Sequence, residues 1–168
     1  MKSRFMIVTL VVVALLFAAS YAGAQTLKKQ IVGTWTPVSA VNEVNGKKVG
    51  DLYGSDPQGQ FMFARDGHFS LFLVARQGRL KFASNNRTAG TVEENKAAVA
   101  GFLSEFGTYT INPDGKSITL HIVASSFPNW DATHQERRIQ IAGDEMKIMV
   151  AAASTGTGSS VITVKRTK

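Results

Sequence analysis

Hydrophobic and polar residues alternate in short runs through most of this chain, a pattern typical of half-buried β-strands. Turn-forming residues separate neighbouring runs, as at Asp66-Gly67, Gly143-Asp144 and Asn112-Pro113-Asp114-Gly115, where residues tolerate positive φ or preset a turn. The predicted strands cover residues 33–42, 59–65, 68–76, 107–112, 117–125, 134–142, 145–152 and 160–166.

Strands joined mainly by hairpins form an antiparallel meander, and closing the meander removes its exposed edges. The expected fold class is therefore all-β: an eight-stranded antiparallel up-and-down barrel with one short helix. The interior of such a barrel is just filled by side chains or holds one small molecule.

The helix is predicted at about residues 92 to 104. Thr91 and Glu94 match a capping box, in which the hydroxyl and the carboxylate each accept from a free backbone amide. The apolar residues near one stripe are Val92, Val99, Phe102, Leu103 and Phe106. A helix of about 13 residues is marginal alone, so we expect it to lie on the outside of a hairpin or to close the barrel mouth.

The hairpin at Asp66-Gly67 allows an inference about faces. A two-residue loop places Arg65 opposite His68 and fixes which side chains share a face. One face then carries Met62, Ala64, Phe69, Leu71 and Leu73, and the other carries Phe61, Phe63, Phe72 and Val74. Because both faces are apolar, one should line the barrel and the other should be covered. Phe63 and Phe72 are candidate ligand-binding residues.

Residues 1–24 have the pattern of a signal peptide, with Lys2 and Arg4 before an apolar stretch over 5–19 and small residues at Ala22-Gly23-Ala24. The stretch is short for a membrane span, which needs about 20 residues. We therefore expect cleavage before Gln25, no integral membrane span afterwards, and a periplasmic or secreted domain over 25–168. A retained membrane anchor is the alternative.

Composition narrows the function classes. The chain has no cysteine, which excludes a disulfide scaffold. Its net charge is +7, and removing Lys2 and Arg4 with the leader lowers this by two. The basic residues are scattered, without the dense stripe or stacking platform that nucleic-acid binding needs. No nucleic-acid partner is predicted.

Several short segments, taken together in their order and spacing, point to one known family: Gly33-Thr34-Trp35, Asp56-Pro57-Gln58-Gly59, Phe82-Ala83-Ser84, Ala89-Gly90-Thr91, Glu93-Glu94-Asn95, Phe106-Gly107-Thr108-Tyr109, His121, Phe127-Pro128-Asn129-Trp130 and Arg166. With these segments the chain resembles the lipocalin-like domain family of bacteria and fungi. The resemblance implies a barrel that binds a small molecule. It also implies structural roles for Gly33, Trp35 and Arg166, with Arg166, or alternatively Lys165, packed on the indole of Trp35.

No catalytic residue, cofactor or metal site is predicted. His68, His121 and His134 lie far apart in sequence, at none of the short spacings typical of metal ligands. The chain lacks a Gly-x-Ser-x-Gly elbow, a nucleotide-binding glycine loop and a cysteine nucleophile.

Four polar or aromatic residues complete the candidate ligand site. His121 points away from the face that carries Ile118 and Ile122, so it is a surface or structural histidine, a polar anchor in the cavity, or a general acid or base. Tyr109 is a cavity wall or a core residue. Trp130 shapes the barrel rim or packs a loop on the core.

Arg137 is the fourth candidate. Arg137 and Arg138 point to opposite faces of one strand, and an inward arginine would favour a ligand that bears a carboxylate.

The sequence favours an exported, non-catalytic barrel that binds a small apolar or amphipathic ligand. Two alternatives stay open: an isomerase or cyclase that uses His121, and a periplasmic module with a filled core that recognises a protein or an envelope polymer through its rim. A cavity too small for a ligand would favour the interaction module. The sequence does not indicate the oligomeric state.

Overall fold

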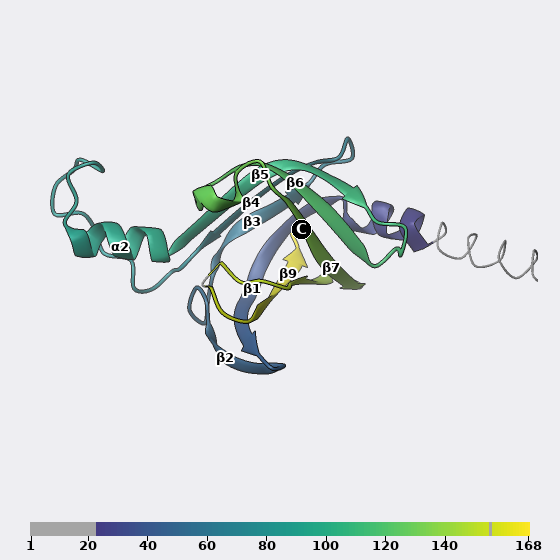
Figure 1. The fold of residues 1–168 in the computed structure, drawn as a ribbon, viewed down its shortest axis with the longest axis horizontal. Coiled ribbons are helices and arrows are strands. Elements are labelled where there is room, and N and C mark those ends of the chain that lie inside the picture. Colours follow the sequence, from purple (N-terminus) through teal and green to yellow (C-terminus); the bar gives the residue numbers. More distant parts are fainter. Residues whose placement is uncertain (1–22, 155) are drawn as a thin grey trace, which may run out of the picture.

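The computed structural model describes residues 23–168 except residue 155, so residues 1–22 of the predicted signal peptide lie outside it (Figure 1). Residues 23–31 are helical. The elements that follow are β1 (Gly33–Val44), β2 (Lys47–Asp51), β3 (Gln58–Phe63), β4 (His68–Val74), α2 (Val92–Ala100), β5 (Phe102–Ile111), β6 (Ser117–Ser125), the 3₁₀-helix η1 (Pro128–Trp130), β7 (His134–Ala142), β8 (Glu145–Val150) and β9 (Ser159–Arg166).

The strands form one antiparallel sheet in the order β2-β1-β3-β4-β5-β6-β7-β8-β9, and β1 also pairs with β9. This last pairing closes β1 and β3–β9 into an eight-stranded barrel, which confirms the predicted fold class. β2 is an additional strand on the end of β1 that the sequence did not predict. Asn45 and Gly46 both have positive φ, 53° and 72°, as a two-residue Asn-Gly hairpin turn requires.

The predicted register of the β3–β4 hairpin is wrong by one residue. Phe63 pairs with Phe69, and the amide of Ala64 donates to the carbonyl of His68 at 2.8 Å, which leaves three residues in the loop instead of two. Gly67 has a φ of 91°, and a residue of positive φ at the end of a three-residue loop is common in hairpins.

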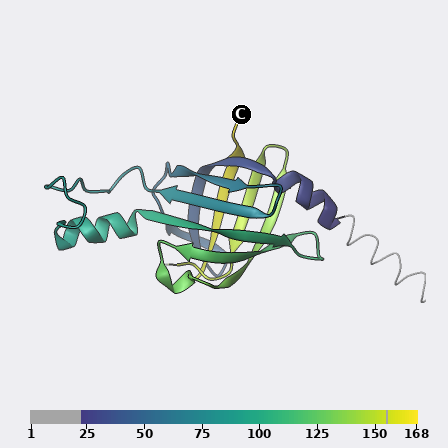
Figure 2. The same ribbon diagram turned by 90° about the horizontal axis from the view of Figure 1, so that it is seen from above.

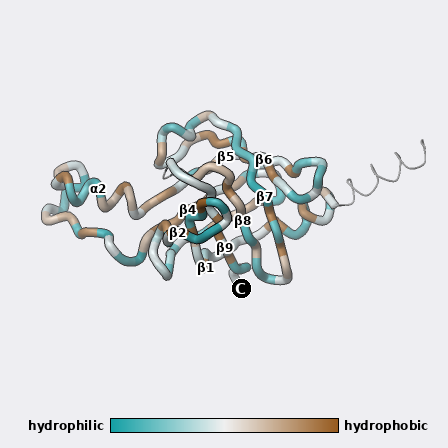
Figure 3. Tube along the Cα trace, turned by 60° about the horizontal axis from the view of Figure 1, so that its bottom comes forward, coloured by the Kyte–Doolittle hydropathy of each residue, from teal (hydrophilic) through white to brown (hydrophobic). Residues whose placement is uncertain are grey.

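This register gives the hairpin one core face and not two apolar faces. The inward residues Phe61, Phe63, Phe69, Leu71 and Leu73 are all buried. Phe72 lies on the outer face and is 43% exposed. Strand side chains alternate between the two faces of a sheet, and Figure 3 shows hydrophobic and hydrophilic positions alternating along the strands.

Helix α2 begins as predicted but is shorter, and it does not cover the hairpin. The capping box is present: the Glu94 amide donates to Thr91 Oγ1 at 3.2 Å, and the Thr91 amide donates to Glu94 Oε2 at 2.8 Å. The helix ends at Ala100 with Gly101 as its C-cap, and β5 begins at Phe102. It projects away from the barrel (Figures 1 and 2), and Val92 and Val99 are 77% and 75% exposed.

One end of the barrel is closed by helical residues 23–31, which place Leu27 and Ile31 in the core. Trp35 is fully buried there, and its Nε1 donates to the carbonyl of Ile31 at 2.9 Å. The guanidinium of Arg166 lies 4.1 Å from the centre of the Trp35 ring. Gly33 allows this approach, since a Cβ at that position would lie 2.7 Å from Arg166 Nη1.

Within the part of the chain that the structure describes, no helix has the length and apolar character needed to cross a membrane.

Candidate functional site

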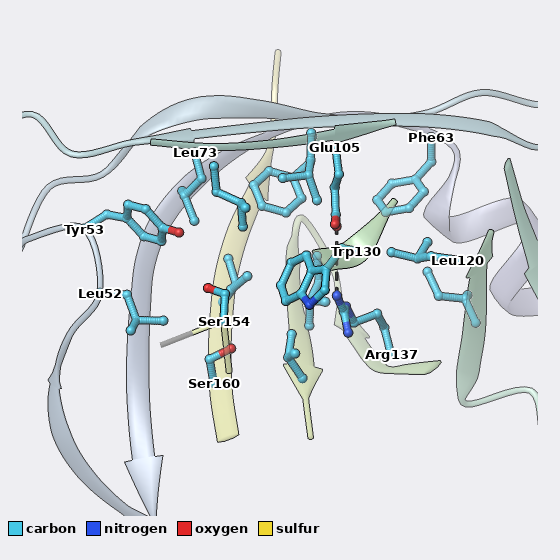
Figure 4. Close-up of a pocket in the computed structure, with 17 residues that line it drawn as sticks. Leu52, Tyr53, Phe63, Leu73, Glu105, Leu120, Trp130, Arg137, Ser154 and Ser160 are labelled. Atoms are coloured by element: carbon cyan, nitrogen blue, oxygen red, sulfur yellow. Dashed lines mark ion pairs between the residues drawn. The ribbon is translucent and has the colours of Figure 1, made fainter. Parts of the chain in front are cut away.

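Residues of the β2–β3 segment, η1 and the β8–β9 segment line one side of the barrel lumen, and we call this side the barrel mouth. Most of its wall is apolar (Figure 4): Leu52, Phe61, Phe63, Leu71, Leu73, Leu103, Ile118, Leu120, Ile148, Val150 and Ile162. The free cavity measures about 30 Å³, enough for roughly two water molecules. Side chains therefore fill most of the lumen in this conformation.

A buried ion pair stands in this apolar interior. Glu105 reaches the lumen from β5 and Arg137 from β7, and the two residues are 3% and 5% exposed. Arg137 Nη2 lies 4.0 Å from Glu105 Oε1 and also donates to Gln135 Oε1. Glu105 Oε2 is buried and has no hydrogen-bond partner among the described residues.

Burial dominates the electrostatics of this pair. It raises the pKa of the Glu105 carboxyl to about 7, although the nearby Arg137 charge acts in the opposite direction. Burial also lowers the pKa of Arg137, and Glu105 opposes that shift. Glu105 is therefore a carboxyl group whose charge can change close to neutral pH.

Trp130 enters the lumen from η1, a short helix in the connection between β6 and β7. The Arg137 guanidinium carbon lies 5.5 Å from the centre of the Trp130 ring, within the range of a cation–π contact. The ring also meets Phe127 edge to face, with 5.6 Å between centroids. Trp130 is half-buried, and its indole lies beside Arg137 and the ion pair in the lumen (Figure 4).

A second hollow of about 220 Å³ adjoins the mouth, and we call it the vestibule. Val99, Ala100, Phe102, Ser126 and Phe127 line it alone, whereas Leu52, Tyr53, Leu103 and Ser154 line both it and the lumen.

Tyr53 belongs to the wall between the vestibule and the lumen. Burial raises the pKa of Tyr53 to about 12, and the Glu105 charge adds to this effect while a side-chain hydrogen bond with Ser154 opposes it. Tyr53 and Ser154 therefore link the β2–β3 and β8–β9 segments across the mouth.

The structure brings three of the six candidate ligand residues together in the lumen: Phe63, Trp130 and Arg137. Arg137 points inward with Ile139, and Arg138 is exposed. The expectation that an inward arginine favours a ligand carboxylate has to be revised, because Glu105 already supplies a negative charge beside it.

The other three candidates do not line the lumen. Phe72 points outward because of the register of its hairpin. His121 lies on the outer face of β6, where its ring contacts His134 on β7 at 4.5 Å between centroids. Ile118, Leu120 and Ile122 take the inner face of that strand, so the alternation excludes His121 from the interior.

Tyr109 is a core residue at the closed end. Its hydroxyl donates to the carbonyl of Ala64 at 2.9 Å, and its ring meets Phe63 edge to face with 5.3 Å between centroids. Both contacts serve the packing of the closed end and leave no donor facing the cavity.

Glu105 is the functional candidate that the sequence analysis missed. The predicted helix ran to residue 104, which concealed the start of β5. The sequence pattern that indicates the strand was present: Leu103, Glu105, Gly107 and Tyr109 alternate with their neighbours, and all four are buried. Extending the strand backwards from Tyr109 would have placed a carboxylate inside the barrel.

The model of the lipocalin-like domain family matches residues 32–167, nearly all of the described chain. The chain belongs to this family. The match confirms the resemblance drawn from the sequence and agrees with the closed barrel.

Two solved structures of mutants of the fluorescent protein UnaG are similar to this lipocalin-like protein. One is 10% identical, with a TM-score of 0.39, and the match covers 83% of this chain and 98% of the other. The second is 9% identical, with a TM-score of 0.37, and the match covers 82% and 96%. A comparison with curated proteins gave no match.

Within residues 23–168, apart from residue 155, the structure has no group of three or more histidine, aspartate or glutamate side chains placed to hold a metal ion.

Proposed function

We propose that this lipocalin-like protein binds a small, largely apolar molecule in the barrel lumen, without covalent chemistry. The observation that carries the proposal is the unpartnered Oε2 of Glu105 in an apolar interior. A buried polar atom without a partner costs about 1–3 kcal/mol. Replacing a buried ion pair by apolar residues is often neutral or stabilising, so stability alone does not account for Glu105 and Arg137.

Binding requires the lumen to gain space, because about 30 Å³ holds no organic ligand. Trp130 is the side chain best placed to move, since it is half-buried and comes from the connection between β6 and β7. A ligand that takes the place of the indole would lie against Arg137. The vestibule beside Leu52 and Tyr53 could hold the remainder of a longer molecule.

The filled lumen also supports the rival interaction module, which recognises its partner through the rim. The two proposals differ in what happens inside the barrel. A carrier must move Trp130 and cover Arg137, whereas a rim-binding module leaves both unchanged.

The affinity that apolar contact can supply is limited. Burying roughly 300 Å² of apolar ligand surface contributes about 7 kcal/mol before the costs of association. Micromolar binding needs about 8 kcal/mol net. Selective binding therefore depends on a polar contact with Glu105 or Arg137.

We also propose that the protein is exported and cleaved before Gln25, on the basis of Lys2, Arg4 and the apolar stretch over 5–19. The test is the mass and N-terminal sequence of the protein recovered from the periplasm or medium of its host. An N-terminus at Gln25 supports the proposal, and a full-length chain in the membrane fraction contradicts it.

Native mass spectrometry of protein purified from its own host tests the binding proposal. We expect a small organic molecule to copurify and Arg137→Met to lower its retention. His121→Ala is the matched control, because His121 lies on the outer face and should not affect retention. A ligand-free mass for the parent, or equal retention by Arg137→Met, would contradict binding in the lumen.

A further inference from the structure

The buried pair of Glu105 and Arg137 carries information about the chemical class of the ligand. This inference rests on the proposed function and concerns the head group that meets the pair. The two side chains offer complementary unused capacity: Glu105 Oε2 is an acceptor without a partner, and a guanidinium carries five N–H donors, of which the Gln135 contact uses one.

The charge balance of the pair restricts the head group further. With both groups ionised, the pair is neutral overall, and the remainder of the lumen wall is mainly apolar. A ligand carboxylate would add an uncompensated negative charge beside Glu105. A ligand ammonium would add an uncompensated positive charge beside Arg137. An uncompensated charge in such an interior costs several kcal/mol.

We propose that the lumen of this protein takes a neutral head group that presents an N–H donor next to a carbonyl acceptor, as an amide or a lactam does. The ligand N–H donates to the free Oε2 of Glu105, and its carbonyl oxygen accepts from the Arg137 guanidinium. Both unused capacities are then satisfied without adding charge to the interior.

The titratable and charged groups that line the lumen with Glu105 are Arg137 on β7 and Tyr53 before β3. Tyr53, with a pKa of about 12, stays neutral below pH 8, and arginine stays charged there. Glu105, whose pKa lies at about 7, is the group that changes charge between pH 6 and pH 8.

Because Glu105 titrates in this range, the affinities for an amide and for a carboxylate head group should change with pH in opposite directions. An amide N–H needs the ionised carboxylate of Glu105, so its affinity should rise about tenfold from pH 6 to pH 8, in proportion to the ionised fraction. A ligand carboxylate needs Glu105 protonated, so its affinity should fall over the same range.

The experiment compares octanamide with octanoate, two chains of equal length that differ in the head group. Binding is measured by calorimetry at pH 6, 7 and 8 on the protein as purified from its host. We expect octanamide to bind the parent more tightly than octanoate at pH 8. The affinity for octanamide should also rise about tenfold from pH 6 to pH 8. Octanoate stays ionised across this range, because aliphatic carboxyl groups titrate near pH 4 to 5.

Glu105→Gln should remove the pH dependence and shift the preference towards octanoate, since the carboxylate that repels it is gone. The matched control is Glu136→Gln. Glu136 is exposed and precedes Arg137 on β7, so this variant removes a carboxylate outside the lumen and should bind both compounds as the parent does. The indole N–H signal of Trp35 reports in each variant that the barrel is folded.

The outcomes separate the two levels of the proposal. Tighter binding of octanoate than octanamide at pH 8, or an affinity for octanamide that falls as pH rises, overturns the head-group assignment and leaves the carrier function standing. If neither compound binds at millimolar concentration and the Trp130 signal does not move, both the assignment and binding in the lumen are wrong.

Discussion

The closed end and the lumen of the barrel each hold an arginine against a tryptophan, and the two pairs differ in how completely their polar groups are satisfied. At the closed end, Arg166 donates to the carbonyls of Val32 and Gln30 at 3.0 and 2.7 Å, and the indole of Trp35 donates to Ile31. In the lumen, Arg137 contacts the half-buried Trp130 and faces a carboxylate with a free oxygen.

This difference separates a structural pair from a candidate binding pair. At the closed end, the hydrogen bonds and the burial of Trp35 fix the first and last strands together. In the lumen, Trp130 contacts Arg137 from η1, and Glu105 Oε2 has no hydrogen-bond partner among the described residues. The same two residue types therefore serve different purposes, according to whether their polar atoms have partners.

The largest expected difference in the free energy of unfolding is between variants that truncate the two tryptophans. Trp35→Ala removes a fully buried side chain and should lower the free energy of unfolding by about 4 kcal/mol. Trp130→Ala removes a half-buried side chain of η1 and should lower the free energy of unfolding by less than about 1.5 kcal/mol. Urea denaturation of both variants checks this, and equal losses would contradict the distinction between the closed-end pair and the lumen pair.

The next largest expected effect on stability comes from breaking the Glu105–Arg137 ion pair. Arg137→Met leaves Glu105 buried without its partner and should lower the free energy of unfolding by about 3 kcal/mol. The double variant Glu105→Leu with Arg137→Met removes both charges and should recover most of that loss. A double variant as unstable as the single one would show that the pair contributes to folding and would remove the main argument for its role in binding.

The pH dependence of stability should be smaller and has a defined sign. Glu105 has a pKa of about 7 in the folded protein and an ordinary value of 4.5. Between these values the folded state holds a proton that the unfolded state lacks, so stability falls as pH rises and levels off above pH 7. From pH 5 to pH 7 the loss should be about 2 kcal/mol.

Denaturant unfolding of the parent and of Glu105→Gln at each pH isolates this contribution, because other groups cancel in the difference. A parent that is no less stable at pH 7 than at pH 5, relative to Glu105→Gln, would show that the carboxyl group is not desolvated as the structure indicates.

The smallest effects concern the polar residues outside the lumen. Tyr109→Phe loses the hydrogen bond to Ala64 and should cost about 1 kcal/mol, while His121→Ala should change stability by less than about 0.5 kcal/mol. Neither should change ligand retention in native mass spectrometry. Loss of ligand in either variant would mean that the site extends beyond the lumen described here.

The barrel was predictable from the sequence because alternation and turn residues act locally. The runs that became β1 and β3–β9 and the capping box at Thr91 all follow from nearby residues. Which side chains of the β3–β4 hairpin share a face was not predictable in the same way. A single extra loop residue at Arg65-Asp66-Gly67 moves every β4 side chain to the opposite face relative to the β3 side chains, and Asp-Gly is compatible with loops of either length.

The site was only partly predictable, because it depends on which face of each strand turns inward. Arg137 and Trp130 were identified as candidates, but nothing local assigns them to the lumen. Glu105 was hidden by a helix that was predicted four residues too long. Its pairing with Arg137 joins β5 to β7, which are not neighbours in the sheet, so only the closed barrel reveals it.

The most direct test follows the two indole N–H signals in a ¹⁵N NMR spectrum, since the chain has only Trp35 and Trp130. The domain is saturated with octanamide or octanoate at constant pH. Binding in the lumen predicts that the Trp130 signal moves while the Trp35 signal keeps its position. Binding that leaves the Trp130 signal unchanged would contradict a ligand site between Trp130, Arg137 and Glu105.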